Sequence, residues 1–461
     1  MRTDPRRTAR RCQILTGVLT GTLVLGVQPS GRLRAQTAVT SAMSESAPTR
    51  LGDLYAQVGR DNPKISAARA LARAAQARVS GATRPPDPQL QLGWMNYSLP
   101  NLAPMPTTGM TQLQVMQMLP LGGKLALAGR AAGAQASATN ERANDVVWEL
   151  RSQTAMAFYD LYTTDQSLRV ARETLRLLQD IEKTAESMYR VGEGRQADVL
   201  RAQVEIAKMA EDTLRMQAMR QSMVARLNAL LDRAADAPVA SPALPSFPDS
   251  VPDRASLEAI ALVGRPMIRA GLEDVNAAEA SEKLARKEIW PDLQVGAQFA
   301  QQPSPMGGGT ERMGSLMFGA SIPVFARDRQ LRMRDEAGAM KQMAQADLAG
   351  MRAETRGKIG EAYANLMRAR NLSQLYRSTV LPQAQATVAL AMSAYRVGGV
   401  DFMTLLDDQM TVNRYQQELY ALDADQGKAW AELEMLTGRE LFDPNQIAVT
   451  GQFRAAARGA K

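Results

Sequence analysis

The side chains best suited to chemistry in this sequence are thioethers and carboxylates, because the usual catalytic residues are missing. The 461 residues contain no histidine and one cysteine, Cys12. This composition excludes the commonest general base, most zinc sites and every Ser-His-Asp arrangement. The sequence has no CxxC motif, and Gly307–Gly309 lacks the strand-to-helix setting of a phosphate loop. We therefore expect neither an enzyme nor a bound cofactor.

Methionine is frequent, with 26 copies, many of them around short strand-like runs and their loops. Thioethers suit Cu(I) or Ag(I), whereas the lack of histidine disfavours zinc or cobalt. Methionine is also a good helix former and fills gaps in cores, so a purely structural role stays open. No dedicated metal site is predicted, and the speculative soft-metal contacts are Met95, Met105, Met110, Met306 and Met313, with Met116, Met118 and Met317 close to them.

The N-terminal residues 1–36 are predicted to be a secretory signal peptide. They combine seven arginines and one aspartate with an apolar stretch from Ile14 to Val27, and cleavage is expected near Ala35 or Ala38. This leader carries most of the net charge of +8, so the basicity gives little support to nucleic-acid binding. Cys12 would leave with the leader. No later stretch reaches about 18 uninterrupted apolar residues, the length of a membrane-spanning helix.

A segment beginning at Tyr189, YRVGEGRQADVL, returns at Tyr395 as YRVGGVDFMTLL. Other anchors repeat at nearly the same spacing, among them PQLQLGW at Pro88 and PDLQVGA at Pro291. The period is too long for the repeat of a solenoid. These repeated anchors predict a duplicated unit. Its parts are a mature N-terminal segment at 37–50, a first repeat at 51–237, a Pro-rich linker at 238–253, a second repeat at 254–440 and a tail at 441–461.

Each repeat is expected to contain a helix, two strands and two long helices. The strands are predicted at about 88–97 and 110–119, and at about 291–300 and 314–323. The long helices are predicted over about 123–232 and 326–437. Apolar or small residues recur at steps of three and four from Leu150 to Leu178, which is heptad spacing. A helix from about Gly123 to Tyr189 would be roughly 100 Å long at 1.5 Å per residue.

The strand-like runs alternate between apolar and polar residues, as in Leu90, Leu92 and Trp94 against Gln89 and Gln91. This alternation is typical of transmembrane barrel strands, and equally of a half-buried soluble sheet. The secretory leader and the aromatic residues at the ends of the runs favour the barrel. Four strands do not close a barrel with a lumen, so several copies would have to share one.

The duplicated strand-strand-helix-helix unit, the prolines at the strand-to-helix junctions (Pro120 and Pro323) and the YxVG motifs resemble the TolC-like outer-membrane efflux proteins. The resemblance covers about 51–440. It implies an α+β membrane protein in the outer membrane, a homotrimer with a shared β-barrel and a periplasmic α-helical barrel. It also implies an exit duct of a tripartite pump, with a periplasmic adaptor and an inner-membrane transporter, of RND type, as partners.

The same resemblance assigns roles to residues at the two YRVG segments. It implies that these are turns at the periplasmic tips where the adaptor docks, namely Tyr189, Arg190, Val191 and Gly192, and Tyr395, Arg396, Val397 and Gly398. The two glycines suit the end of an α-helix, where the backbone adopts a left-handed conformation. The family closes its tunnel with acids near these tips, which by motif matching would be Asp407, with Asp408 beside it, and Asp198. Two ordinary glycine-capped hairpins and solvated aspartates are the alternative.

The transported substrate stays open at this stage. Metal ions are one class, and MNYSLPNLAPMP is similar to loops of copper and silver efflux outer components. Organic compounds such as drugs, and proteins secreted through the same fold, are the others. A protein of another class, a soluble periplasmic coiled-coil adaptor or scaffold, would also explain the heptads and the leader, but not four amphipathic strand runs.

Overall fold

The computed structural model describes residues 48–98, 101, 103–105, 108–304 and 308–446. The predicted signal peptide at 1–36, most of the segment at 37–50, Met306 and the end of the tail lie outside these residues. Among the residues described, no helix combines the length and the hydropathy needed to cross a bilayer.

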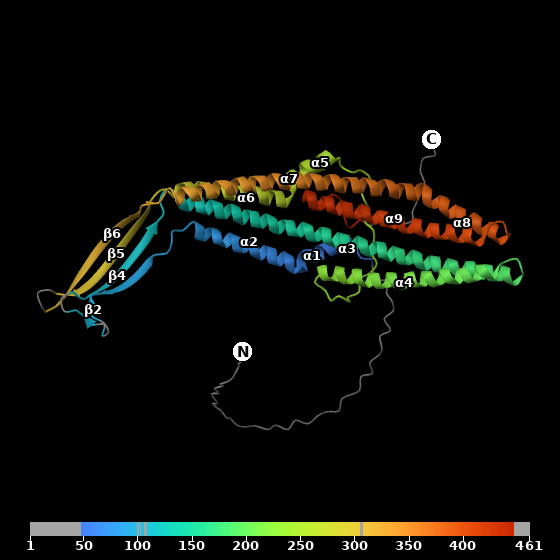
Figure 1. Ribbon diagram of the computed structural model, residues 1–461, viewed down its shortest axis with the longest axis horizontal. Coiled ribbons are helices and arrows are strands. Elements are labelled where there is room, and N and C mark those ends of the chain that lie inside the picture. The colour runs from blue at the N-terminus through green and yellow to red at the C-terminus, as the bar shows by residue number, and fades with distance from the viewer. Residues whose placement is uncertain (1–47, 99–100, 102, 106–107, 305–307, 447–461) are drawn as a thin grey trace, which may run out of the picture. The chain divides into compact units, whose positions relative to one another are not determined.

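The elements of the second half follow the same order as those of the first (Figure 1). Each half has two short helices, two long strands and then long helices that reverse direction once. The first half contains α1 (Leu51–Asp61), α2 (Pro63–Ala82), β1 (Gln89–Met95), β4 (Met110–Leu119), α3 (Lys124–Arg190) and α4 (Gln196–Leu230). The second contains α5 (Arg254–Gly264), α6 (Pro266–Lys287), β5 (Asp292–Pro303), β6 (Thr310–Ser321), α7 (Gln330–Leu375), α8 (Leu381–Arg396) and α9 (Phe402–Thr437). A small hairpin, β2 (Tyr97–Ser98) and β3 (Ala103–Pro104), lies between β1 and β4.

Proline sets the same helix boundary in both halves. Pro63 and Pro266 occupy the first positions of α2 and α6, where a missing backbone N–H costs nothing and the fixed φ suits a helix. Asn62 caps α2 by accepting a hydrogen bond from the backbone N–H of Lys64 at 2.9 Å, and its amide donates to the Leu230 carbonyl at 2.8 Å. The second cap position is Arg265, which lacks a side-chain cap of this kind.

The four long strands form one antiparallel sheet in the order β1-β4-β5-β6. The register places Leu90, Val115, Ala297 and Leu316 in one row, and Gln91, Gln114, Gln298 and Ser315 in the next. Because neighbouring residues of a strand point to opposite faces, the sheet has an aliphatic face and a glutamine face. Among the residues that the structure describes, β1 and β6 each have one edge without a partner strand.

The helices enclose a main core around α3 and α9. Helix α3 packs against α2, α4, α6 and α9, and α7 packs against α6 and α9. The heptad stripe predicted from Leu150 to Leu178 is buried, apart from the half-buried Leu175. Trp430, Phe158 and Tyr159 fill the centre of this core. The Tyr159 ring lies against Gly427, where an added Cβ would be 2.2 Å from Cζ.

The long helix of the second half is interrupted, which the sequence prediction of continuous helices missed. A π-helical turn, η1 (Tyr376–Val380), separates α7 from α8 and stands just before Pro382. Proline has no N–H to donate and its ring clashes with the preceding turn, so a wider turn relieves the helix there. Arg377 of this turn pairs with the buried Asp423 of α9.

Candidate functional site

The first YRVG segment ends α3 and forms the turn to α4. Gly192 has φ 82°, a left-handed conformation that glycine adopts without the steric cost of a Cβ. Its N–H donates to the Tyr189 carbonyl at 3.1 Å, and the Glu193 N–H donates to the Met188 carbonyl at 2.9 Å. Tyr189 and Val191 are exposed, and the Arg190 side chain pairs with Glu186 at 2.5 Å.

The second YRVG segment builds a closely related turn between α8 and α9. Gly398 has φ 74°, so both glycines adopt the predicted left-handed conformation. Asp401 is the N-cap of α9 and accepts a hydrogen bond from the Met403 N–H at 3.2 Å. Val397 is 82% exposed. Both turns therefore present an exposed valine beside a helix-terminating glycine.

The two turns lie next to each other and share a cavity of about 300 Å³. Its lining includes Met188, Arg195 and Asp198 from the first hairpin and Tyr395 and Phe402 from the second. Beneath it, a second hydrophobic cluster joins α3, α4, α8 and α9. The rings of Tyr395 and Phe402 meet edge to face, 5.7 Å apart.

The equivalent tyrosines of the two motifs differ, a difference that the repeated sequence did not reveal. Tyr189 is 46% exposed, whereas Tyr395 is 5% exposed. Within the described residues, the Tyr395 hydroxyl has no hydrogen-bond partner. Burial raises the pKa of Tyr395, and the carboxylates of Asp198 and Asp401 raise it further. The exposed apolar side chains at the two turns are therefore Tyr189, Val191 and Val397 rather than two equivalent tyrosines.

The three acids predicted near the tips occupy different environments. Asp198 is 8% exposed and faces the cavity between the turns. Asp407 is exposed on the second turn of α9, and Asp408 is half-buried. Asp198 therefore lines the cavity between the turns, whereas Asp407 is not among its lining residues. Any ring of like charges at Asp407 has to come from several copies.

The speculative soft-metal methionines lie at the sheet and its adjoining loop. Met95, Met110 and Met313 occupy the glutamine face, and Met95 pairs directly with Met110 across β1 and β4. Met105 is exposed in the loop after β3. In the described part of the chain, the side chains of Asp, Glu and Cys nowhere form a group of three that would hold a metal ion.

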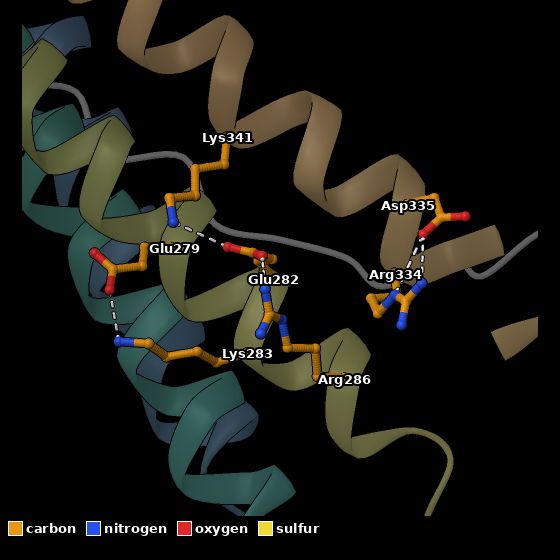
Figure 2. Close-up of polar contacts among 7 residues, drawn as sticks. All are labelled: Glu279, Glu282, Lys283, Arg286, Arg334, Asp335 and Lys341. Atoms are coloured by element: carbon orange, nitrogen blue, oxygen red, sulfur yellow. Dashed lines mark hydrogen bonds and ion pairs between the residues drawn. The ribbon is translucent and has the colours of Figure 1, made fainter. Parts of the chain in front are cut away.

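A larger cavity, of about 710 Å³, lies between α3, α6 and α7 and was not predicted. Its lining includes Met333, Met340, Met343 and Met351 of α7. Figure 2 shows the ion pairs beside it, where Glu282 of α6 accepts from Arg286 at 2.5 Å and from Lys341 of α7 at 3.1 Å. Both donors lower the pKa of Glu282, and the hydrogen bond from Lys341 has the larger effect. In the sequence, the i,i+4 spacing of Glu282 and Arg286 indicates an ion pair within α6. It does not indicate the second ion pair, between Glu282 and Lys341 of α7.

Comparison with known proteins shows which sequences this chain is similar to. The sequence model described as outer membrane efflux protein matches residues 54–233 and 259–439, most of the chain. The pyoverdine export outer membrane protein OpmQ of Pseudomonas putida is 28% identical over 184 residues, which are 38% of each chain, so this chain matches little more than a third of that relative's length.

Solved structures show the same fold. A crystal structure of CusC aligns with a TM-score of 0.73 and 19% identity, covering 85% of this chain and 93% of that chain. The outer membrane protein VceC of Vibrio cholerae aligns with a TM-score of 0.72 and 18% identity, covering 84% of this chain and 96% of that chain. The predicted TolC-like fold, with its duplicated unit of strands and long helices, is confirmed.

Proposed function

The chain belongs to the outer membrane efflux protein family, and from this premise we propose that three copies form the exit duct of a tripartite efflux pump. It is an outer-membrane transport protein and not an enzyme. The observation that carries the proposed duct is a four-stranded sheet with two open edges and an exposed apolar face.

The apolar face of the sheet suits contact with lipid. Leu90, Leu316 and Phe318 are 64%, 75% and 74% exposed, and Trp290 and Phe325 at the strand ends are also exposed. A water-soluble protein rarely exposes so continuous an apolar surface. In an outer-membrane barrel such residues form the lipid-facing band, with aromatic residues at its rims. This face argues against the alternative of a soluble periplasmic adaptor or scaffold.

The open edges of β1 and β6 support closure by further copies. Unpaired backbone N–H and C=O groups are not tolerated against lipid, so each edge needs a partner strand. Four strands are too few to enclose a lumen, whereas three copies would supply twelve. In this arrangement β6 of one copy would pair with β1 of the next.

The helix turns are the proposed contact with the periplasmic adaptor, which in turn joins an inner-membrane transporter of RND type. The exposed residues Tyr189, Val191 and Val397 support this assignment, with Arg190 and Arg396 beside them. The proposed gate rests on Asp407, which threefold symmetry would repeat around the bore. Asp408 and Asp198 are the secondary candidates.

We propose heavy-metal ions such as Cu(I) or Ag(I) as the exported substrate. The thioethers on the glutamine face of the sheet, which would face the lumen, support this class over zinc or cobalt. A second candidate is a small organic molecule, since the relative OpmQ is described as a pyoverdine exporter.

The test is complementation of a Gram-negative strain that lacks its other outer-membrane ducts, with the cognate adaptor and pump supplied from the same operon. We expect this chain to restore growth in silver or copper salts more than growth in organic drugs. Restored drug tolerance without metal tolerance would support the small-molecule alternative. If the chain stays in the soluble periplasmic fraction and restores neither, the duct assignment is wrong.

A further inference from the structure

The glutamine face of the sheet carries two methionines that flank a glycine. Met116 of β4 and Met317 of β6 stand in one row with Gly296 of β5 between them. A Cβ added to Gly296 would lie 3.2 Å from Cγ of Met116 and 3.5 Å from Cε of Met317. Both side chains therefore bend over the glycine from opposite sides, and Gly296 is buried beneath them.

The surroundings of this pair are polar but uncharged. The next row holds Gln114, Gln298 and Ser315, and the row on the other side holds Met118 and Gln294. Gln298 donates to the Gln112 side-chain oxygen at 2.6 Å, so amides on this face are held in place by one another. Met116 and Met317 are half-buried and Met118 is 37% exposed. The two thioethers are thus half-buried and still reachable from the open side of the face.

We propose that Met116 and Met317 form a binding site for a soft monovalent cation, of the Ag(I) or Cu(I) class, on the lumen wall of the barrel. Thioether sulfur prefers such ions, while the lack of carboxylate and imidazole at this point offers little to Zn²⁺ or Mg²⁺. Met118 and the amide oxygens of the adjoining glutamines are the further ligands within the neighbouring rows. The lumen position rests on the proposed duct.

Two thioethers bind such an ion more weakly than a closed set of three or four ligands. A weak site suits a passage, because an ion that moves through a pore has to bind and then leave. The site would attract the cargo along the wall without trapping it. Packing of methionine into the gap above a glycine is the alternative, and it gives the sulfur atoms no partner ion.

The test follows the methionine methyl groups by NMR. The chain, purified from outer membranes in detergent with ¹³C-methyl methionine, is titrated with silver nitrate in chloride-free buffer. Met116→Leu and Met317→Leu each identify one resonance by its loss and keep a side chain of similar volume. We expect the Met116 and Met317 signals to move together and at lower silver than the signal of Met403, an exposed methionine on α9 that serves as the control.

If Met116 and Met317 bind one ion together, the silver-induced shift of each signal has to depend on the other methionine. In Met116→Leu the early shift of the Met317 signal should be lost, and Met317→Leu should do the same to Met116. Gly296→Ala keeps both sulfurs but adds a Cβ 3.2 Å from Cγ of Met116 and 3.1 Å from the Val115 carbonyl oxygen, so it should displace the Met116 side chain and also weaken the shift. If the Met317 signal titrates unchanged in Met116→Leu, or no earlier than Met403 in the unsubstituted chain, the pair is packing only.

This outcome is separable from that of the proposed function, because the titration needs neither adaptor nor pump. Coupled shifts in a chain that restores no metal tolerance would leave the site standing and remove metal export. Metal tolerance with uncoupled shifts would support metal export and rule out the methionine site.

Discussion

Asp407 is the residue on which the proposed gate depends. Asp198 is buried in the cavity between the turns, and Asp401 is engaged as the cap of α9. Asp407 is exposed one turn further along α9, with no such engagement to its own helix terminus. It is therefore the acid best placed to project into a bore shared by several copies.

The substitution Asp407→Asn tests this gate. Three carboxylates near one axis repel each other and attract cations, and asparagine removes both effects while keeping the side-chain shape. In planar bilayers we expect the variant to lose block by divalent or trivalent cations added from the periplasmic side. Asp408→Asn should do less, since it points about 100° away on the helix. Block that survives the combination of both with Asp198→Asn would mean that the chain has no acidic gate.

Glu434 is a second residue whose charge has a measurable consequence. It is buried near the end of α9, and its Oε1 accepts from the backbone N–H of Leu441 at 2.8 Å. Burial raises the pKa of Glu434 to about 7, above the ordinary value of 4.5, although that hydrogen bond and Arg151 lower it. The folded chain thus holds a proton that the unfolded chain releases between these values.

The free energy of unfolding should therefore fall as the pH rises from about 4.5 to about 7. Glu434→Gln keeps an acceptor for the Leu441 N–H and removes the titration, so it should flatten this part of the pH profile. Thermal unfolding followed by circular dichroism measures it, with the exposed Glu211→Gln as control. A profile that stays as steep in Glu434→Gln would assign the pH dependence to other groups.

At the scale of elements, the spacing of apolar residues along the sequence predicted which residues share one face of a strand or helix. Alternation in Leu90, Leu92 and Trp94 gave the faces of β1, and the heptad stripe gave the buried side of α3. The hairpin of β2 and β3, the π turn before Pro382 and the burial of Tyr395 were missed. The burial of Tyr395 depends on the first turn, which is distant in the sequence, and a repeated motif does not encode that contact. The hairpin and the π turn are local, since β2 and β3 pair residues within Tyr97–Pro104 and the π turn precedes Pro382, but neither interrupts the hydrophobic periodicity on which the prediction rested.

The helix turns carry the prediction that belongs to this scale. Gly192→Val and Gly398→Val place a β-branched residue at positive φ, which costs about 1–3 kcal/mol and reshapes the turn. We expect normal outer-membrane levels but lost efflux in the complementation strain. Gly399→Ala is the matched control in the same turn, because φ there is not left-handed and the added Cβ would be 3.4 Å from its nearest neighbour. Full tolerance in both valine variants would show that adaptor docking does not use these turns.

At the scale of the whole molecule, a single chain leaves its main surfaces incomplete. The sheet has two open edges and an exposed apolar face, and its strands enclose no lumen. In the proposed duct, the charge at Asp407 and the glutamine face would act only when further copies surround a common axis. The proposed duct therefore depends on the assembly of several copies.

The most direct test is the mass of the protein purified from outer membranes in mild detergent, measured by light scattering with the detergent contribution subtracted. We expect a monodisperse particle with three times the protein mass of one mature chain. It should resist mild SDS, because paired strand edges have to separate before the particle dissociates. A stable, monodisperse monomer under the same conditions would contradict it.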